Sequence, residues 1–458
     1  MQSEVWLLWA TLAAALLYYL TSAARRGGTG GRQPPGPTPL PVLGNLLDLG
    51  GNLHHTLARL ARVHGPVMKL KLGLVTTVVV SSGDAAREAY TRYDRHLAAR
   101  AVPDAANAVG NSGRSMIWLP SSDPLWKTLR GIVASHIFSP RGLAAARGVR
   151  ERKVRDMVGY FRRHAGEEVD VGQAVYGGVL NLRPLDLQGW RRWAGARYQK
   201  VFGILDGIID RRLADARTST GEHAHGDFLD SLLELVSAGK IGRDKVTVIL
   251  FDVFAAGTDT MAITVEWAMA ELLRHPRAMA KVRAEMEDIL GGKDTNTLEE
   301  PDAASLPYLQ AVVKEVMRLH PVAPIMLPHQ AAEDGVEIGG FAVPRGATVI
   351  FNVWAIMRDS AAWERPDEFV PERFLDKSAA VEFRGKDYEF IPFGSGRRLC
   401  PGLPMAERVV PFVLASLLHA FEWRLPGGVA ADELDVAERF TTVNTLAVPL
   451  RAVPVVVT

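Results

Sequence analysis

The 458-residue sequence predicts a mainly α-helical protein with a small β part. Apolar residues recur at helical spacing over most of the chain, whereas the alternation of apolar and polar residues that indicates strands occurs in only two places. Hydrophobic residues make up 48% of the chain and charged residues 23%, which is typical of a globular core. The length allows one large domain or two.

The first predicted element is a membrane-spanning helix. From Val5 to Ala24 the chain is apolar apart from two threonines and one serine, and about 20 such residues suffice to cross a bilayer. Arginines follow this stretch and none precedes it, so the positive-inside rule places the rest of the chain in the cytosol. A cleaved signal peptide is the alternative, but it needs a basic start and a shorter apolar stretch. We therefore expect a single-pass anchor over residues 1–26.

Residues 27–40 are a predicted hinge between this anchor and a body over residues 41–458. The hinge is rich in glycine and contains Pro34-Pro35-Gly36-Pro37, which is stiff and cannot form a helix. The formal charge of +2 gives no general attraction to nucleic acid. A single cysteine excludes an intramolecular disulfide framework and fits the reducing side of a membrane.

Within the body, periodicity predicts the remaining elements in order. Alternation around Gly73-Leu74 and around Gly339-Gly340 predicts hairpins over Val67–Ser81 and Val336–Val349, which would make a minor sheet. Helical spacing predicts helices over Ala85–Asp94, Leu143–His164, Tyr198–Arg217, Arg243–Leu273, Pro276–Leu290, Leu306–Arg318 and Pro404–Phe421.

The only cysteine, Cys400, lies in the loop Phe393-Gly394-Ser395-Gly396-Arg397-Arg398-Leu399-Cys400-Pro401-Gly402. Glycines let a backbone pass close to a flat ligand, and a thiol beside two guanidinium groups should ionise easily and can bind a metal. A lone cysteine is more often buried and inert. The loop, however, resembles the haem-binding loop of the cytochromes P450, whose aromatic residue, glycines, arginine and cysteine it matches in spacing. The resemblance implies that Cys400 is the axial thiolate ligand of a haem iron and that Phe393 also contacts the haem.

Glu315 and Arg318 lie three residues apart and so share one helix face. Alone they would be read as a surface pair. Pro371-Glu372-Arg373-Phe374 follows downstream, and the resemblance implies that Glu315, Arg318 and Arg373 form a buried three-way ion pair that braces the cysteine loop. The forked geometry of such a pair suits arginine and not lysine.

The predicted helix Arg243–Leu273 carries Ala255-Ala256-Gly257-Thr258-Asp259-Thr260 near its middle. A helical glycine costs roughly 1 kcal/mol relative to alanine, and a threonine can turn its hydroxyl back onto the preceding turn, so this stretch should be locally weak. A packing notch would explain the small residues. The resemblance implies instead that Ala256 and Gly257 make room for dioxygen, and that Thr260 and Asp259 hold water and relay protons.

Trp126 and Arg130 lie on adjacent turns of one predicted helix face, where both can reach one anionic group. A basic helix surface is the simpler account, but the resemblance implies a clamp on a haem propionate. His329 and Arg398 are further propionate candidates, with a surface histidine as the alternative for His329. A positive face around the cysteine would suit an acidic electron donor, and its expected members are Lys127, Arg397, Arg398 and Arg408.

The resemblance places the substrate pocket along Val102–Trp118, Phe254–Ala256, Val322–Leu327 and Thr441–Leu446. Candidate lining residues are Ala256, Val322, Ile325, Met326 and Thr442. Their mostly apolar character favours a hydrophobic substrate such as a terpenoid, although the same residues can equally form core. The hinge, the anchor and the Ala-Gly-Thr-Asp-Thr stretch resemble microsomal plant members, particularly the terpenoid- and alkaloid-oxidising branch that includes geraniol hydroxylases.

One stretch departs from the family. Between Trp126 and Thr260 the chain is short by roughly 40 residues, enough for a helix, its connections and part of a second helix. The shortening is expected near Asn181-Leu182-Arg183-Pro184, within residues 180–184, where Pro184 breaks a helical pattern. The end of one scaffold helix and the helix that roofs the substrate pocket would then be missing.

Together, the resemblance implies a membrane-anchored monooxygenase of the endoplasmic reticulum with a cytosolic catalytic domain. It would use haem b and O2, insert one oxygen atom into a lipophilic small molecule, and receive electrons from NADPH through a flavoprotein, NADPH-cytochrome reductase. A haem-thiolate isomerase or dehydratase is an alternative that Asp259 and Thr260 argue against. A non-catalytic or degenerate haem protein is a second alternative, because of the shortened lid region.

Overall fold

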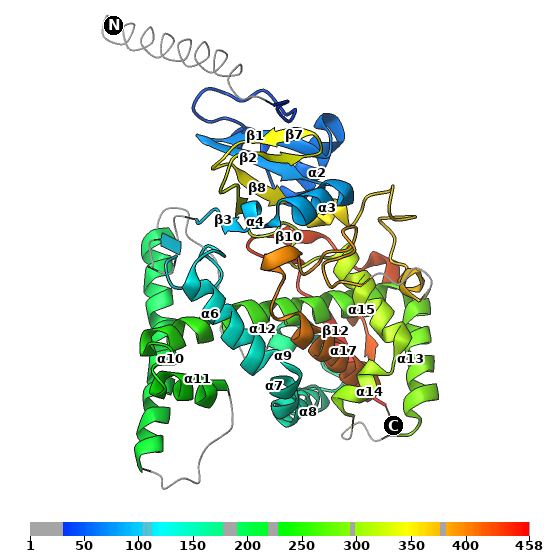
Figure 1. Ribbon diagram of the computed structural model, residues 1–458. Helices are drawn as coiled ribbons and strands as arrows, with labels where there is room; N and C mark the ends of the chain where they lie inside the picture. The colour runs from blue at the N-terminus through cyan, green and yellow to red at the C-terminus, as the bar shows by residue number, and fades with distance from the viewer. Residues whose placement is uncertain are drawn as a thin grey trace, which may run out of the picture. The chain divides into compact units, whose positions relative to one another are not determined.

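The computed structural model describes residues 31–457 apart from 104–105, 108–109, 111, 177–189, 219–227, 294–297 and 376–381. The predicted anchor and the stretch expected to be shortened lie outside the described residues. The chain divides into two compact units. The first comprises Met1–Ala101 and Ile325–Trp363, and the second comprises Val102–Pro324 and Glu364–Thr458 (Figure 1).

The first unit is built around a five-stranded sheet of order β1-β2-β8-β5-β3. Only the pairing of β2 with β8 is parallel. A separate hairpin joins β6 and β7. The described elements of this unit are η2 Leu46–Asp48, α2 Leu53–His64, β1 Val67–Leu72, β2 Val75–Val80, α3 Gly83–Arg92, α4 Asp94–Leu97, β3 Ala99–Arg100, β5 His329–Gln330, β6 Val336–Ile338, β7 Phe341–Val343, β8 Thr348–Phe351 and α16 Val353–Ile356.

The two predicted hairpins are present, but they do not form one sheet. β1 and β2 turn at Gly73, whose φ of 59° is the left-handed conformation that glycine adopts readily. β6 and β7 turn at Gly339 and Gly340 and pair only with each other. β8 begins within the second predicted hairpin range, at Thr348, yet it joins the larger sheet beside β2. Periodicity reveals strands but not their partners, which explains the difference.

The second unit is mainly helical. Its small sheets are β4-β12-β9 and the hairpin β10-β11. The described helices are α6 Pro124–Ile132, η3 Val133–Ile137, α7 Pro140–Ala145, α8 Arg147–Arg163, α9 Val171–Tyr176, α10 Trp190–Thr218, α11 Phe228–Ser237, α12 Arg243–Arg274, α13 Pro276–Leu290, α14 Glu300–Ala304, α15 Pro307–Leu319, η5 Pro371–Phe374, η7 Gly396–Arg398, α17 Leu403–Ala420, η8 Pro426–Gly428 and η9 Ala431–Glu433. The described strands are β4 Val169–Asp170, β9 Phe421–Arg424, β10 Glu438–Phe440, β11 Asn444–Leu446 and β12 Arg451–Val456.

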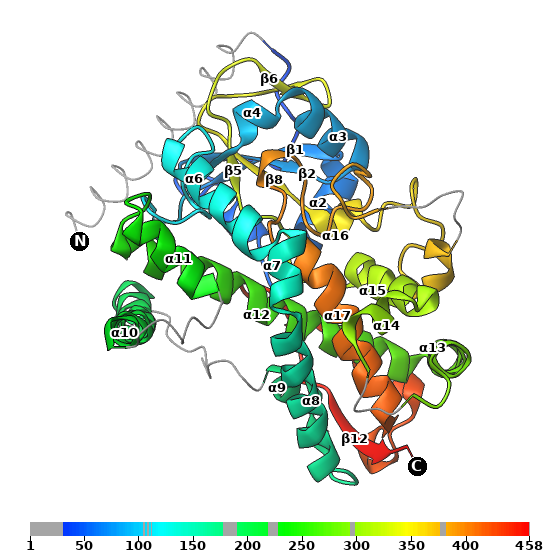
Figure 2. The ribbon, with the colours of Figure 1, turned by 60° about the horizontal axis from the view of Figure 1, so that its bottom comes forward.

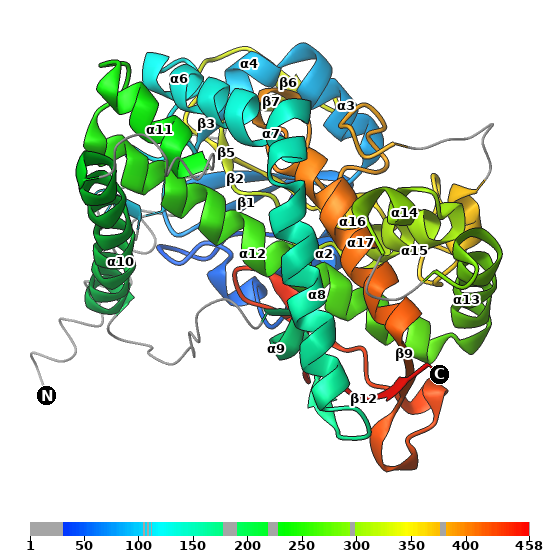
Figure 3. The ribbon, with the colours of Figure 1, turned by 90° about the horizontal axis from the view of Figure 1, so that it is seen from below.

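Helix α12 is the axis of this unit. It contacts α9, α10, α11, α15 and α17, and Figures 2 and 3 show α10 and α11 near one end of it and α17 crossing it further along. Every residue from Ala262 to Leu273 is buried, whereas Phe254, Ala255 and Ala256 are exposed. By length and composition α12 and α17 could each cross a membrane, but both pack here among the other helices of the unit.

Most predicted helices of this unit are present within a few residues. There are two exceptions. Helix α10 begins at Trp190, eight residues before the predicted Tyr198, and the range Leu143–His164 is not one helix but α7 followed by α8. Ala146, between them, adopts φ −87° and ψ 0°, which lies outside the α-helical region and separates the two helices. Alanine is the best helix former, so the sequence gives no signal for this break.

Candidate active site

Cys400 lies just before the N-terminus of α17, at the end of a tightly turned loop. Its N–H donates to the Phe393 carbonyl at 3.0 Å, which closes the loop. Gly394 and Gly396 have φ of 75° and 62°, so the glycines are needed at these turns. The N–H groups of Gly402 and Leu403 donate to the sulfur. The loop therefore holds one sulfur against the positive end of a helix.

The prediction that the neighbouring guanidinium groups make the Cys400 thiol ionise easily is wrong. Although part of the residue is accessible, burial of the sulfur raises the pKa of the thiol, and the two N–H donors and the Arg130 guanidinium lower it only in part. Arg398 instead donates to backbone carbonyls, and Arg397 is exposed. The chain alone thus keeps Cys400 as a thiol, and a metal cation would supply the charge that makes it a thiolate.

The arrangement fits a haem. Its single sulfur donor stands on a helix N-terminus and can offer one axial ligand, which is the donor set of a haem-thiolate centre. In the same unit, the chain's own side chains leave the apolar residues Phe254 to Ala256 exposed in the middle of a core helix. A flat apolar group and an apolar substrate are the kinds of ligand that such a surface accepts.

The predicted oxygen-activation stretch forms an unbroken part of α12, despite Gly257. The Thr258 hydroxyl donates to the Phe254 carbonyl at 2.9 Å and the Thr260 hydroxyl to the Ala256 carbonyl at 2.8 Å. These back-bonds fix the hydroxyl protons and leave each oxygen able to accept a hydrogen bond from water. Asp259, between the two threonines, is half-buried.

Glu315, Arg318 and Arg373 meet in a buried cluster. Arg318 binds both carboxylate oxygens of Glu315, at 2.8 and 2.9 Å, and Arg373 Nε lies 3.1 Å from one of them. Glu315 and Arg318 are fully buried. Carbonyls of Glu364, Arg365, Pro366 and Glu368 accept from the two guanidinium groups. The cluster therefore ties α15 to the chain from Glu364 to Arg373.

Aromatic rings continue from this cluster toward the cysteine loop. Phe374 follows Arg373, and its ring centroid lies 5.1 Å from that of Phe390. The Phe383 ring lies 6.1 Å from Phe390 and 5.5 Å from Phe393, which belongs to the loop. The four rings form a packed path from the ion cluster to the loop.

The second-unit candidates for a propionate clamp gather beside the cysteine loop, and each has a protein partner. The Trp126 indole N–H donates to the Met116 carbonyl at 3.1 Å. Arg398 donates to the carbonyls of Met116 and Leu119, with its guanidinium carbon 5.0 Å from the Trp126 ring centroid. Arg130 donates to the Leu399 carbonyl. Trp126 and Arg130 therefore do not share one acceptor here, and their role toward a propionate stays a prediction.

His329 belongs to the first unit, on β5, and it is buried. Its Nδ1 lies 2.7 Å from the Leu97 carbonyl, so the alternative of a surface histidine is wrong. Ile325 and Met326 belong to the same unit, and the Tyr90 hydroxyl donates to the Met326 sulfur at 3.1 Å.

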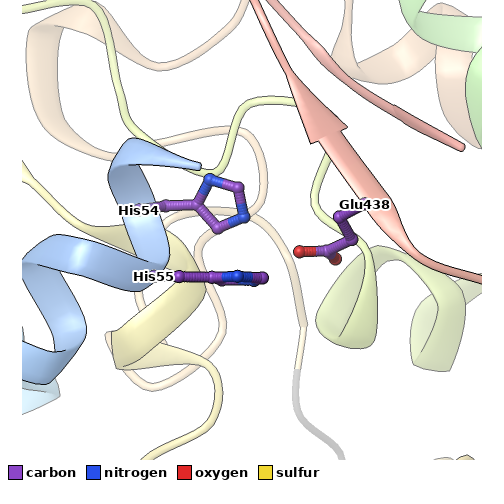
Figure 4. Close-up of side chains that lie close together, drawn as sticks. All are labelled: His54, His55 and Glu438. Carbon is purple, nitrogen blue, oxygen red and sulfur yellow. The ribbon is translucent and has the colours of Figure 1, made fainter. Parts of the chain in front are cut away.

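The first unit also carries two adjacent histidines that the sequence analysis did not single out. The rings of His54 and His55 on α2, drawn in Figure 4, lie 4.2 Å apart. The His55 ring lies 4.5 Å from that of Trp354 on α16. They belong to the packing of α2 against α16. Glu438, also drawn in Figure 4, belongs to the second unit.

The other pocket candidates belong to the second unit. Ala256 is exposed on α12, and Thr442 is exposed in the turn between β10 and β11. The Val322 carbonyl accepts from the Asn444 N–H at 2.9 Å, which links the end of α15 to β11.

Asp252, one turn before Ala256 on α12, was missed by the sequence analysis. It is buried and accepts from the Ser115 hydroxyl at 2.8 Å and from the Met116 N–H at 2.8 Å. Burial raises its pKa to about 6, against the lowering effect of these donors. Through Met116 it supports the acceptor of Trp126 and Arg398. The available signal was an aspartate inside an apolar helix, Phe251-Asp252-Val253.

Comparison with known proteins agrees with this geometry. The family model described as Cytochrome P450 matches residues 34–183 and 176–444. Cytochrome P450 76M5 of Oryza sativa subsp. japonica is 62% identical over 504 residues, covering 99% of each chain. Ent-cassadiene C11-alpha-hydroxylase 1 of the same plant is 58% identical over 99% of each chain. Geraniol 8-hydroxylase of Swertia mussotii is 39% identical over 92% of this chain and 93% of its own.

A solved structure of a zebrafish cytochrome P450 with progesterone superposes with a TM-score of 0.74 at 25% identity, covering 88% of this chain and 99% of that one. The match to Cytochrome P450 76M5 spans 504 positions, so at least 46 of them (504 less 458) have no residue in this chain. The two segments of the family match meet at residues 176–183.

A thiol on a helix N-terminus, the buried ion cluster and a family match along most of the chain lead to the same conclusion. Members of the family bind haem b, use O2 as co-substrate and take electrons from a reductase. The chain belongs to the cytochrome P450 family and is a monooxygenase.

Proposed function

We propose that this monooxygenase hydroxylates a terpenoid, on the cytosolic face of the endoplasmic reticulum, with electrons from NADPH-cytochrome reductase. The observation that carries the proposal is the apolar exposed turn Phe254 to Ala256 on the core helix that also bears Asp259 and Thr260. An apolar surface beside proton-carrying groups suits oxygenation of a hydrocarbon. Relatives whose names describe hydroxylation of ent-cassadiene and of geraniol support the substrate class.

Cys400 would hold the haem iron through its sulfur, Phe393 would contact the haem, and Trp126, Arg130, Arg398 and His329 would bind its propionates. When bound, haem supplies the activation of O2, so that substrate, O2, NADPH and a proton yield hydroxylated substrate, water and NADP⁺. The chain's own part is to orient the substrate, exclude water and deliver protons.

Proton delivery is assigned to Thr260 and Asp259. The Thr260 proton is held by the Ala256 carbonyl, so the hydroxyl oxygen accepts from water and fixes its position. Asp259 is half-buried and can exchange protons with solvent. Ala256 offers no side chain beyond a methyl group, which leaves room for a ligand there.

The reductase is proposed to dock on the exposed basic residues near the cysteine loop. Lys127, Arg397 and Arg408 are exposed, on α6, η7 and α17 respectively. Positive charge steers an acidic partner by long-range attraction. Residues 1–26 are the proposed anchor, and their deletion should release the protein from membranes at least in part, without altering its haem spectrum.

The test combines spectroscopy with turnover. Reduced protein with carbon monoxide should show the absorption band of a thiolate-ligated haem, and Cys400→Ala and Cys400→Ser should lose it. Ent-cassadiene and geraniol, supplied with reductase and NADPH, should give hydroxylated products. Retention of the band in Cys400→Ala would refute the ligand assignment. Absence of hydroxylated product with both probes would refute the substrate class.

A matched pair of variants tests the proton-delivery assignment. Thr260→Ala should consume NADPH but release more of the reducing equivalents as hydrogen peroxide. Thr258→Ala removes the same kind of hydrogen bond, from a threonine hydroxyl to the carbonyl four residues earlier, but Thr258 is not part of the proposed Asp259–Thr260 pair. This variant should form as much product per NADPH as the parent. Equal product yields per NADPH in both variants would remove the role of Thr260.

A further inference from the structure

A second buried cluster lies in the same unit, around His320. The ring of His320, just after α15, is stacked on Trp267 of α12, with centroids 3.9 Å apart and planes 2° from parallel. Its Nε2 lies 2.7 Å from Glu271 Oε1, and its Nδ1 lies 3.1 Å from Glu438 Oε1. The ring and both carboxylate side chains are almost fully buried.

Both ring nitrogens therefore face carboxylate oxygens. A neutral imidazole has one N–H and can satisfy one acceptor, whereas the cationic ring donates to both. Burial raises the pKa of Glu271, but hydrogen bonds from His275 and His320 outweigh it and lower the value to about 2. Glu271 is thus an ionised acceptor, and His320 joins it to Glu438 through its two ring nitrogens.

The cluster fixes the first strand of the β10–β11 hairpin. Glu438 begins β10, so its contact with His320 fixes this strand to α12 and to the end of α15. The second strand is held independently, because the Trp267 indole N–H donates to the Asn444 carbonyl at 3.2 Å and the Asn444 N–H donates to the Val322 carbonyl at 2.9 Å. The exposed turn between the strands carries Thr442.

We infer that His320 is a positioning residue that sets where the β10–β11 turn stands and thereby which substrate carbon is presented for oxygenation. It is almost fully buried and acts on the turn through Glu438. If the contact of His320 with Glu438 is lost, β10 is no longer fixed while β11 still is. The turn can then shift Thr442 without unfolding of the unit, and this shift would change the product distribution. The inference rests on the proposed place of Thr442 in the substrate pocket.

The first test measures the clamp without substrate. Hydrogen exchange of the peptide 436–447 should rise about tenfold in His320→Gln and in Glu438→Gln, because each loses a charged contact to β10. His275→Gln is the matched control, since His275 also binds Glu271, at 3.1 Å, but does not touch the hairpin. Unchanged exchange in both test variants, at parental haem content, would overturn the inference whatever the substrate is.

The second test measures products. With a turned-over terpenoid probe, His320→Gln and Glu438→Gln should change the ratio of hydroxylated isomers at least threefold, while His275→Gln keeps the parental ratio. A merely structural role predicts lower melting temperatures with an unchanged ratio, and that result would refute the positioning role. If no probe is turned over but exchange rises as expected, the substrate class fails and the clamp stands.

Discussion

Two of the buried ion clusters among the described residues of the second unit have opposite composition. In the first, one carboxylate, Glu315, lies between two guanidinium groups. In the second, one imidazole, His320, lies between two carboxylates. Arginine keeps its charge at every physiological pH, whereas histidine and carboxylates titrate. The chain therefore has a carboxylate between two arginines beside the segment that leads to the cysteine loop, and a histidine between two acidic side chains beside the β10–β11 hairpin.

The largest expected effect comes from breaking the first cluster. Glu315→Gln would leave the fully buried guanidinium of Arg318 and the partly buried one of Arg373 without a carboxylate, which costs about 3–5 kcal/mol. We expect little folded protein with bound haem, measured as haem per polypeptide and as melting temperature. Glu364→Gln, at a side chain 88% exposed, is the control and should change neither. A haem content close to the parent in Glu315→Gln would contradict the brace.

Glu266, on the same helix as Glu271, sharpens the contrast. It is buried and accepts from the Leu450 N–H at 3.0 Å, and burial raises its pKa to about 7. A buried carboxyl group whose pKa is higher in the folded than in the unfolded protein makes the fold less stable when it ionises. The free energy of unfolding therefore falls as pH rises from the unfolded-state pKa toward 7. Glu266→Gln should therefore gain about 1–3 kcal/mol over the parent above pH 7 and little near pH 4. Unfolding by urea at both pH values measures this, and an equal difference at both would contradict the assignment.

The third prediction concerns the positions missing from the chain. Both clusters lie outside residues 176–183. The missing positions should therefore affect substrate binding while leaving haem retention unchanged. A form in which the segment after Leu182 is restored should bind a terpenoid about tenfold more tightly and waste less NADPH, because the pocket is then roofed and water is excluded. Spectral titration with a common substrate measures this. Equal affinity and turnover would show that this chain roofs its pocket in another way.

The smallest effect is expected at the edge of the second cluster. The hydrogen bond to Glu271 raises the pKa of His275, against the effect of burial. A raised histidine pKa stabilises the fold below the unfolded pKa, and this contribution is lost as pH rises through the folded value. His275 is partly exposed, so we expect His275→Gln to cost under about 1 kcal/mol at pH 6 and nothing at pH 9. A cost that grows with pH would contradict the pairing.

The sequence predicted those parts of the fold that depend on local patterns. α12, α13, α15 and α17 begin and end within a residue or two of their periodic ranges. The break at Ala146 escaped prediction, since alanine favours helix. The separation of β8 from the β6–β7 hairpin escaped it too, since strand partners are chosen by contacts far apart in the chain.

The same limit applies to the site. Glu315, Arg318 and Arg373 lie in spaced motifs, so they could be named in advance. Asp252 and His320 could not, because their meaning comes from Ser115 and Glu438, each more than 100 residues away in sequence. The ionisation of Cys400 was wrongly predicted because burial of the sulfur raises the pKa of the thiol, and Arg398, two residues away in sequence, donates to backbone carbonyls instead.

The packed rings from Phe374 through Phe390 and Phe383 to Phe393 connect the cysteine loop to residues that are not part of it. Rings in a close-packed row transmit changes of volume, because each fills the space that its neighbours leave. Phe390 is fully buried and carries no charge, no ligand atom and no proton. A change in the size of this one hydrocarbon side chain therefore alters how the cysteine loop is packed, while every charge in the unit stays the same.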